Sequence, residues 1–407
     1  MARTLVGLDI GSSGVRAAEF AVQRRRVTLR RFAAVPLPPG VVRAGTVVDG
    51  EALTEALKEV RSLGKFSTRN VTLGIANAGV MVRQMDLDWM PPRDFAKALR
   101  YQVEDALPFP VEEANLDYHL LEELDVATAG GEPRRVARVL LIAATREMVD
   151  AFVSAAQRAG LRPTGVDLLP FALVRARTPG GLDPAGEVEA IVDIGADVVS
   201  VVVHAGGVPR YVRMIPGIGG DAVTEAVQQR YDWTWDDAER TKLFVGLPGH
   251  ARMDAGQQEA VGTRGDGLDH PAQKVIGAAV ETLVQEIVTT LDFYRSSTAD
   301  ADGGPVAEPA GGGYQGLDDP MGPDGHDEVD GYPDVANAPR SPAIARLLLA
   351  GSAARLGGLR ELLEDRLDLS VEMLDAHTDI RAPRKVRATG TLPSLAVSAG
   401  LCVGASR

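Results

Sequence analysis

The sequence predicts an α/β protein made of two related halves that face each other. The first observation is a strand that runs into the turn Asp9-Ile10-Gly11-Ser12-Ser13. The second is an echo of that turn, Asp193-Ile194-Gly195-Ala196-Asp197, in the second half of the chain. The third is that each turn is followed by two more strands and then a helix. A repeat on this scale favours two homologous halves.

The first half opens with apolar and β-branched runs separated by Gly and Ser, which predicts an antiparallel meander. Leu53, Leu57 and Val60 then recur at helical spacing, and Asp49 precedes them as an N-cap residue. A short apolar run follows and predicts a buried strand. The predicted elements are strands over Thr4–Ile10, Val15–Val22 and Val27–Val35, a helix over Gly50–Leu63 and a strand over Val71–Ala76.

Residues 80–160 have the order strand, helix, strand, strand, helix and predict a separate unit. Pro91-Pro92 starts the first helix and Pro108 stops it, because proline fits the first helical turn and cannot continue a helix. Gly160 is a suitable C-cap for the last helix. The predicted elements are Val80–Leu87, Pro91–Leu107, Asn115–Leu124, Arg135–Ala143 and Arg146–Ala159.

The second half restarts at Glu187 and repeats the opening order of strands. The predicted strands are Val188–Asp193, Val198–His204, Arg210–Ile215 and Ala345–Ala350. The predicted helices are Asp221–Tyr231, Trp235–Phe244, Lys274–Ser297, Leu359–Asp368 and Pro393–Val403. Residues 299–340 are rich in Gly, Pro and Asp and have few large apolar side chains, so their burial cannot offset the entropy cost of ordering. We expect a disordered acidic insertion there.

The net charge of −13 is concentrated in one segment, because residues 299–340 hold ten Asp/Glu and one Arg. The basic cluster Arg24-Arg25-Arg26 is short and predicts a solvated hairpin, so we expect no nucleic-acid partner. The single cysteine, Cys402, excludes an intrachain disulfide and fits a reducing compartment. The uncharged stretch Thr389–Ser406 predicts a buried helix rather than a membrane span, and no signal peptide is recognisable.

The turn Asp9–Ser13 has the residue types of a phosphate and metal site. Gly11 permits close backbone approach, and successive N–H groups can surround phosphate oxygens, with the hydroxyls of Ser12 and Ser13 as further donors. Asp9 suits a hydrated Mg²⁺, which binds one or two carboxylates together with phosphates. An ordinary β-hairpin turn is the alternative, and the echo at Asp193 favours the binding site.

A third turn, Gly351-Ser352, follows an apolar strand and would let a flat purine ring approach closely. A plain strand-to-helix turn explains that motif equally well when it is taken alone. Glu239 and Lys242 lie three residues apart on one predicted helix, either as a solvated pair or as ribose contacts. The sequence lacks GxxxxGK[ST], HExxH, GxSxG and a GxGxxG between strand and helix, which leaves no competing phosphate loop, zinc site or hydrolase elbow.

The three turns and the small-residue stretch Leu392–Leu401 resemble the actin-like ATPase superfamily, which includes sugar kinases. Within it, the chain is similar to the PilM family of type IV pilus assembly proteins, relatives of the cell-division protein FtsA. Five stretches carry this resemblance: VGLDIGSSGVRAAE (6–19), LPPGVVRAG (37–45), YQVEDALPFPV (101–111), DLLPFA (167–172) and EIVTTLDFYR (286–295). It covers nearly everything except residues 246–272 and 299–340.

The resemblance implies an actin-like two-lobed ATPase fold of duplicated RNase H-like cores, with an inserted FtsA-type 1C subdomain. Residues 1–79 and 161–186 then form lobe I, 80–160 the 1C subdomain, 187–388 lobe II, and 389–407 a helix that returns to lobe I. ATP would bind between the lobes, with Mg²⁺ held through water by Asp9 and Asp193. The implied nucleotide contacts are Asp9, Gly11, Ser12, Ser13, Asp193, Gly195, Ala196, Gly219, Glu239, Lys242, Gly351 and Ser352.

The resemblance also implies a cytoplasmic scaffold at the inner face of the cytoplasmic membrane. Its partner would be the short cytoplasmic N-terminal tail of the inner-membrane protein PilN, received in a groove beside the 1C subdomain, and through PilN the protein PilO and the pilus platform. Self-association is left open. One alternative is a filament-forming FtsA-like membrane adaptor, which requires a basic amphipathic C-terminal helix. The other is a small-molecule kinase, which requires a catalytic base and a sugar pocket.

This sequence departs from the family pattern at three places. Asp197 follows the second Gly-Ala where Ser or Thr is usual, Ser352 stands where Gly is usual, and Leu169 precedes a proline where Glu or Gln is common. Leucine cannot activate a water molecule. We therefore expect ATP binding with weak or no hydrolysis. The candidates for a catalytic group are Asp9 and Asp167, and Asp167, two residues before position 169 on a predicted strand, would face the same side as that position.

Overall fold

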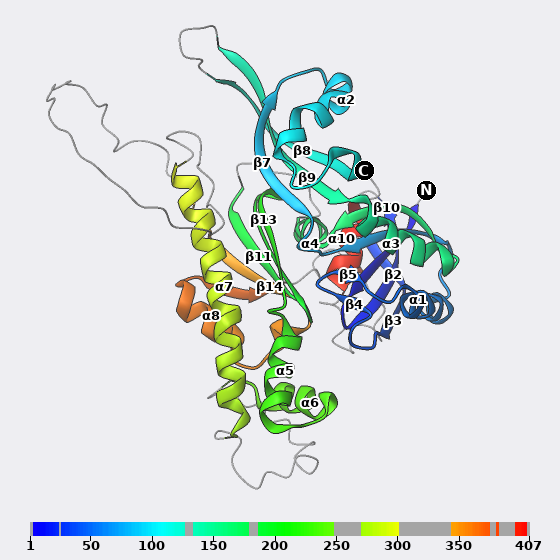
Figure 1. Ribbon diagram of the computed structural model, residues 1–407, viewed down its shortest axis with the longest axis vertical. Coiled ribbons are helices and arrows are strands. Elements are labelled where there is room, and N and C mark those ends of the chain that lie inside the picture. The colour runs from blue at the N-terminus through cyan, green and yellow to red at the C-terminus, as the bar shows by residue number, and fades with distance from the viewer. Residues whose placement is uncertain are drawn as a thin grey trace, which may run out of the picture.

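Two mixed β-sheets with the same strand order form the framework of the molecule (Figure 1). The computed structural model describes residues 3–23, 26–126, 133–178, 186–247, 270–300, 343–374, 380–381 and 395–404. Each sheet, with its covering helices, forms one lobe. A third, smaller sheet contacts β13 (Val208–Pro216) of the second lobe and continues into helix α3 (Arg146–Arg158) of the first.

The sheet of lobe I has the order β10-β6-β1-β2-β3-β16. Strands β1, β2 and β3 form an antiparallel meander, while β6 joins β1 and β10 joins β6 in parallel. The strands are β1 (Arg3–Gly11), β2 (Gly14–Gln23), β3 (Arg26–Pro36), β6 (Asn70–Ile75), β10 (Arg162–Leu168) and β16 (Ile380–Arg381). A two-stranded hairpin of β4 (Val42–Arg43) and β5 (Thr46–Val47) follows β3.

The sheet of lobe II has the order β13-β12-β11-β14-β15. Its first three strands again form an antiparallel meander, and β14 and β15 add in parallel on the other side of β11. The strands are β11 (Val188–Ile194), β12 (Val198–Ala205), β13 (Val208–Pro216), β14 (Arg346–Ala350) and β15 (Ser370–Met373). Strand for strand this repeats β3-β2-β1-β6-β10, so the duplication predicted from the two Asp-Ile-Gly turns is confirmed.

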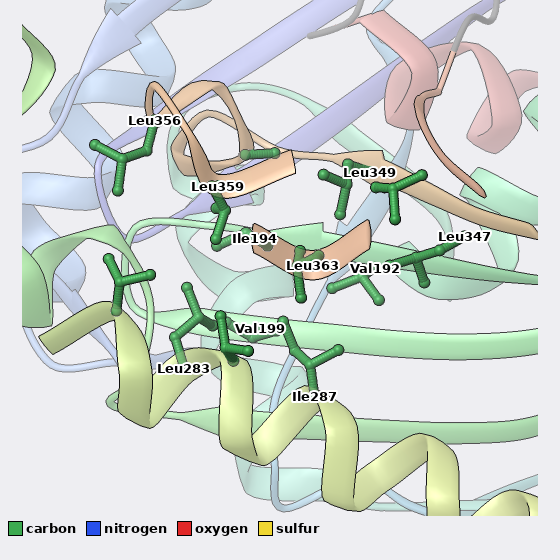
Figure 2. Close-up of a cluster of buried hydrophobic side chains, with 14 of the residues drawn as sticks. Val192, Ile194, Val199, Leu283, Ile287, Leu347, Leu349, Leu356, Leu359 and Leu363 are labelled. Carbon is green, nitrogen blue, oxygen red and sulfur yellow. The ribbon is translucent and has the colours of Figure 1, made fainter. Parts of the chain in front are cut away.

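Helices cover the outer face of each sheet. In lobe I, α1 (Gly50–Gly64) begins at Asp49, whose side chain accepts hydrogen bonds from the N–H groups of Glu51 and Ala52 at 3.0 and 2.9 Å. Such a cap stabilises a helix by about 1 kcal/mol. In lobe II the covering helices are α5 (Gly220–Tyr231), α6 (Trp235–Val245), α7 (Ala272–Asp300) and α8 (Leu359–Leu367), with a short helical turn η5 (Ala353–Arg355) after β14. Figure 2 shows Leu283 and Ile287 of α7 pointing toward Val199 in the cluster that closes this face.

Two further helices, α4 (Leu169–Arg177) and α10 (Ala396–Gly404), lie between the sheets. They share one buried cluster with side chains from both sheets, including Phe20 of β2 and Ile191 of β11. Small residues permit this packing: a Cβ on Gly400 would lie 1.8 Å from the carbonyl oxygen of Ala172. The C-terminal stretch is thus a buried helix, as predicted. The sequence does not predict helix α4, because five of its nine residues are buried and its polar residues, Arg175 and Arg177, lie only in the last turn.

The third sheet has the order β7-β9-β8 and packs against α2. Its elements are β7 (Met81–Asp88), α2 (Pro92–Val103), the helical turns η1 (Glu104–Ala106) and η2 (Val111–Glu113), β8 (Ala114–Val126) and β9 (Arg134–Thr145). The helix predicted to reach Leu107 ends earlier, because Leu107 precedes a proline and is extended.

Helix α3 (Arg146–Arg158), predicted as the last element of the separate unit, packs instead on α1 and buries Met148 and Phe152 in the lobe I core. It connects β6 to β10 as α8 connects β14 to β15, so it belongs to the duplicated core. The division of the chain into domains, with an inserted subdomain over residues 80–160, stays a prediction.

Most of the predicted acidic insertion 299–340 lies outside the described residues. Within the described part of the chain, no helix has the length and apolar character needed to cross a membrane.

Candidate functional site

A cavity of about 520 Å³ lies between the two lobes. That size is within the range of small-molecule binding sites. Its walls are the turns at the ends of β1, β11 and β14, together with residues from α4, α5 and α6. Of the twelve residues expected to contact nucleotide, all but Gly219 line it: Asp9, Gly11, Ser12, Ser13, Asp193, Gly195, Ala196, Glu239, Lys242, Gly351 and Ser352.

Strand alternation directs Asp9 and Asp193 into this space. In β1, Val6, Leu8 and Ile10 belong to the outer core of lobe I, so Asp9 faces the opposite lobe. In β11, the even-numbered residues from Val188 to Ile194 belong to the outer core of lobe II, so Asp193 faces lobe I. The two carboxylates therefore meet across the cavity, although they come from distant parts of the sequence.

Burial perturbs both carboxylates, and repulsion from Asp9 adds to its effect on Asp193. Burial, and then repulsion from Asp9, raise the pKa of Asp193 to about 7, while Arg16 opposes this rise. The pKa of Asp9 is also raised by burial, against the influence of Arg16. A divalent cation between two such groups would relieve their repulsion, and one or two carboxylates are what Mg²⁺ uses when phosphates and water complete its shell. The donor set thus fits Mg²⁺.

Arg16 is a cavity residue that sequence reasoning missed. Its guanidinium Nη1 lies 3.4 Å from Asp9 Oδ2. The hairpin register pairs Asp9 with Arg16 and Gly11 with Gly14, so both side chains project on the same face of the sheet. That register follows from the two-residue turn Ser12-Ser13, and it was the available signal.

The first turn leaves its backbone open to a ligand. A Cβ added at Gly11 would meet nothing closer than 3.7 Å, so a side chain there would occupy cavity space rather than collide with protein. Ser13 is fixed from behind, because its carbonyl accepts a hydrogen bond from the N–H of Leu37 at 3.0 Å.

The second turn is held from behind by the start of α5. The N–H groups of Gly220 and Asp221 donate to the carbonyls of Gly195 and Ala196 at 2.9 and 2.7 Å. A Cβ on Gly219 would lie 2.4 Å from the Ala196 oxygen. Gly219 therefore supports the turn by close packing and does not line the cavity.

Asp197 lines the cavity, but both oxygens of its carboxylate already accept hydrogen bonds from the protein. Its Oδ2 accepts a hydrogen bond from the N–H of Ala44 in lobe I at 2.5 Å, and its Oδ1 accepts one from Gly217 at 3.1 Å. The departure from the family pattern thus places a carboxylate in a contact that joins the lobes.

Glu239 and Lys242 form the ion pair that their spacing predicted, and the lysine is buried. Lys242 Nζ lies 2.5 Å from Glu239 Oε2 and donates to the carbonyl of Gly220 and the hydroxyl of Thr224 at 2.9 and 2.8 Å. Because three protein acceptors engage its three N–H groups, Lys242 ties α6 to α5. Glu239, about one-third exposed, is the better placed of the two to accept a hydrogen bond from a ligand hydroxyl.

Gly351 brings the third turn close against the second. Its φ is +89°, and a Cβ there would lie 2.2 Å from the carbonyl oxygen of Ile194. No other residue type fits both restrictions without strain. Leu243 of α6 and Arg355 of η5, the helical turn that follows Ser352, also line the cavity.

Asp167 lies outside the cavity lining, whereas Leu169 is part of it. The Asp167 carboxylate pairs with Arg175 and accepts a hydrogen bond from the N–H of Leu168 at 2.8 Å. Residues 167 and 169 do not share a face, because β10 ends at Leu168 and α4 begins at Leu169. The hypothesis that Asp167 replaces a polar group at position 169 has no geometric support.

The comparisons agree with this architecture. The sequence matches the family model of the type IV pilus assembly protein PilM over residues 7–257 and that of the cell division protein FtsA over residues 190–400. Among solved structures, the "PilM-PilN type IV pilus biogenesis complex" superposes with a TM-score of 0.73 at 23% identity, covering 99% of this chain and 98% of that chain.

Two weaker matches are the ethanolamine utilization protein EutJ from Carboxydothermus hydrogenoformans and MreB 5 of Spiroplasma citri bound to AMPPNP. The EutJ match has a TM-score of 0.46 at 13% identity and covers 98% of this chain and 89% of that chain. The MreB 5 match has a TM-score of 0.47 at 12% identity and covers 98% and 95%. The superposition on the PilM-PilN complex and the two duplicated sheets show the actin-like two-lobed fold. Because the first family model spans more than half of the chain, the chain belongs to the PilM family of type IV pilus assembly proteins.

Proposed function

We propose that this chain binds ATP with Mg²⁺ in the interlobe cavity. The observation that carries the proposal is the convergence of three sequence-distant turns, after β1, β11 and β14, on one cavity of suitable size. Asp9 and Asp193 would hold the hydrated metal, and the first two turns would hold phosphate oxygens. Glu239 would accept from the ribose, and Gly351-Ser352 would lie against the base. Bound Mg²⁺ would neutralise charge on the phosphates.

Hydrolysis would be slow. A water molecule is activated by a polar side chain within hydrogen-bond reach. The cavity wall at the start of α4 carries Leu169 instead. This favours a protein that uses nucleotide to set the closure of its lobes over a small-molecule kinase. A filament-forming FtsA-like membrane adaptor is the remaining alternative.

The partner we propose is the cytoplasmic N-terminal tail of PilN, and through it PilO and the inner-membrane platform. Membership of the PilM family and the superposition on a PilM-PilN complex support this assignment. The tail would bind in a groove beside the β7-β9-β8 sheet, on the cytoplasmic side of the inner membrane. Strand β7 contacts β13 of lobe II, while β9 leads directly into α3 of lobe I. The subdomain therefore touches both lobes, so lobe closure would alter the groove.

Calorimetry with ATP·Mg²⁺ tests the nucleotide proposal. Wild type should bind one ATP per chain, and Asp9→Asn should weaken binding at least about tenfold, since the metal loses a charged ligand. Asp236→Asn, on the exposed face of α6, is the matched control and should bind like wild type. Absence of binding to the wild type would refute the nucleotide proposal.

Fluorescence anisotropy of a labelled PilN tail peptide tests the coupling. If ATP binds the closed lobes better than the open ones, the peptide affinity should change about tenfold when ATP·Mg²⁺ is added. An unchanged affinity would leave a scaffold without a nucleotide switch. No binding of the peptide in either state would refute the partner assignment.

A further inference from the structure

One contact made of protein atoms alone joins the two lobes at the lining of the interlobe cavity. Asp197, on the second turn of lobe II, accepts a hydrogen bond from the backbone N–H of Ala44 in lobe I. Ala44 and Gly45 form the turn of the β4–β5 hairpin. Both Asp197 and Gly45 line the cavity, from opposite sides.

Both ends of this contact are fixed in place by their own lobes. On the lobe II side, the N–H of Gly217 makes a bifurcated hydrogen bond to Asp197, with the backbone carbonyl at 3.0 Å and Oδ1 at 3.1 Å as its two acceptors. The other carboxylate oxygen is therefore directed to Ala44. A hydrogen bond with a charged acceptor is about twice as strong as one between neutral groups.

On the lobe I side, the buried side chain of Asn77 anchors the hairpin. Its Nδ2 donates to the carbonyl of Gly45 at 2.7 Å and to Thr46 Oγ1 at 2.9 Å, and its Oδ1 accepts from Gly79 at 2.6 Å. The turn is held in a left-handed conformation, with φ of +50° at Ala44 and +72° at Gly45. A Cβ at Gly45 would lie 1.9 Å from the Ala76 oxygen. The N–H of Ala44 is thus held in position before it meets its partner.

Apolar packing continues the contact beside this hydrogen bond. Val198, the residue after Asp197, and Met214 of β13 belong to the buried cluster of lobe I, which also contains Val41 and Val42. Separation of the lobes at this point would expose these side chains as well as break the hydrogen bond, so the contact favours closed lobes.

We propose that Asp197 is a positioning residue that clasps lobe II to the β4–β5 hairpin and raises the population of closed lobes independently of nucleotide. A protein whose binding-competent state is more populated binds its ligand more tightly, in proportion to that population. The clasp would thus set the fraction of molecules whose lobes are already closed before ATP binds, and so the free energy that ATP binding must supply to close the rest. Its consequence for ATP affinity rests on the proposed function, whereas its effect on closure does not.

The distance between the lobes measures closure directly. Spin labels at Glu59→Cys on α1 and Gln229→Cys on α5, both exposed positions, report the distance between the lobes by double electron–electron resonance. The native Cys402 is buried, and burial raises the pKa of its thiol, so it stays unlabelled. Asp197→Ala should lengthen and broaden the distance distribution. Asp197→Asn keeps an oxygen acceptor for Ala44 but loses the charge and turns its NH₂ group toward the N–H of Gly217, so its distribution should lie between those of wild type and Asp197→Ala.

Asn77→Ala provides an independent test from the other lobe, because it releases the hairpin and leaves Asp197 unchanged. It should open the lobes as Asp197→Ala does, and the double variant should open no further, since both remove one interaction. An unchanged distance distribution in Asp197→Ala would overturn the clasp, as would additive opening in the double variant.

Calorimetry separates the clasp from simple charge repulsion. If Asp197 only repelled a bound polyphosphate, Asp197→Asn and Asp197→Ala would tighten ATP·Mg²⁺ binding alike. The clasp predicts that the two variants diverge, with Asp197→Ala binding about tenfold more weakly than Asp197→Asn. Equal tightening by both variants would overturn it. Failure of wild type to bind ATP would refute the proposed function and leave the distance measurement as the test of the clasp.

Discussion

Replacing Lys242 with methionine decides whether this residue supports the fold or contacts ligand. Methionine keeps most of the volume and removes the charge that Glu239, Gly220 and Thr224 surround. Removal of one partner of a buried ion pair costs about 3–5 kcal/mol. Glu239 is 35% exposed and regains part of its hydration. We therefore expect Lys242→Met to lower the free energy of unfolding of lobe II by about 3 kcal/mol.

Urea unfolding followed by tryptophan fluorescence measures this loss. Trp233 and Trp235 report on lobe II at the start of α6, and Trp89 reports on the subdomain after β7. Arg240→Met is the control, because the pair of Arg240 with Asp237 is more than half exposed on both sides and contributes little. If Lys242→Met unfolds within about 1 kcal/mol of wild type but loses ATP affinity, the residue is a ligand contact and the structural assignment is wrong.

Three further outcomes follow from single residues. Gly351→Ala should cost at least about 2 kcal/mol and abolish ATP binding, since its left-handed φ and the Ile194 carbonyl both exclude a side chain; near wild-type stability in thermal unfolding would contradict this. Leu169→Gln should raise ATP turnover at least about tenfold in a phosphate-release assay, and unchanged turnover would show that this position does not limit hydrolysis. Burial lowers the pKa of His204 from 6.5 to about 4, so the unfolded chain takes up a proton first as the pH falls. The contribution of His204 to the free energy of unfolding should be present in full above pH 6.5 and be about 3 kcal/mol smaller at pH 4. Carboxylates with a raised pKa, such as Asp193, act in the opposite direction in both proteins, so the difference between wild type and His204→Gln is the quantity to measure, and a difference that does not change with pH would exclude this role of His204.

The duplicated fold could be predicted because its signals are local. A buried strand that ends in Asp-Ile-Gly appears twice, and each copy is followed by the same order of elements. The pairing of β11 with β14 and of β1 with β6 then brings the third turn, and its counterpart in lobe I, beside the first two. The cavity residues on these turns follow from that pairing.

What escaped prediction depends on contacts between distant segments. Arg16 could have been found from the hairpin register, but the partner of Asp197 could not, because Ala44 lies in a different lobe and donates through its backbone. Burial of Lys242 depends on how α6 packs on α5. Sequence order places helix α3 with the subdomain because it follows β9 directly, whereas its apolar face packs against α1 in the core of lobe I. Sequence order alone does not determine which core an element joins.

The location of the bound adenine base shows whether the nucleotide binds between the lobes. Photolysis of this chain with an ATP analogue that carries an azide on its adenine, followed by peptide mass spectrometry, identifies the residues beside the base. We expect label on the segments that hold Leu243 and Ser352, competition by ATP·Mg²⁺, and loss of label in Asp9→Asn. Label confined to other segments, or label that ATP does not displace, would contradict binding of the nucleotide between the lobes.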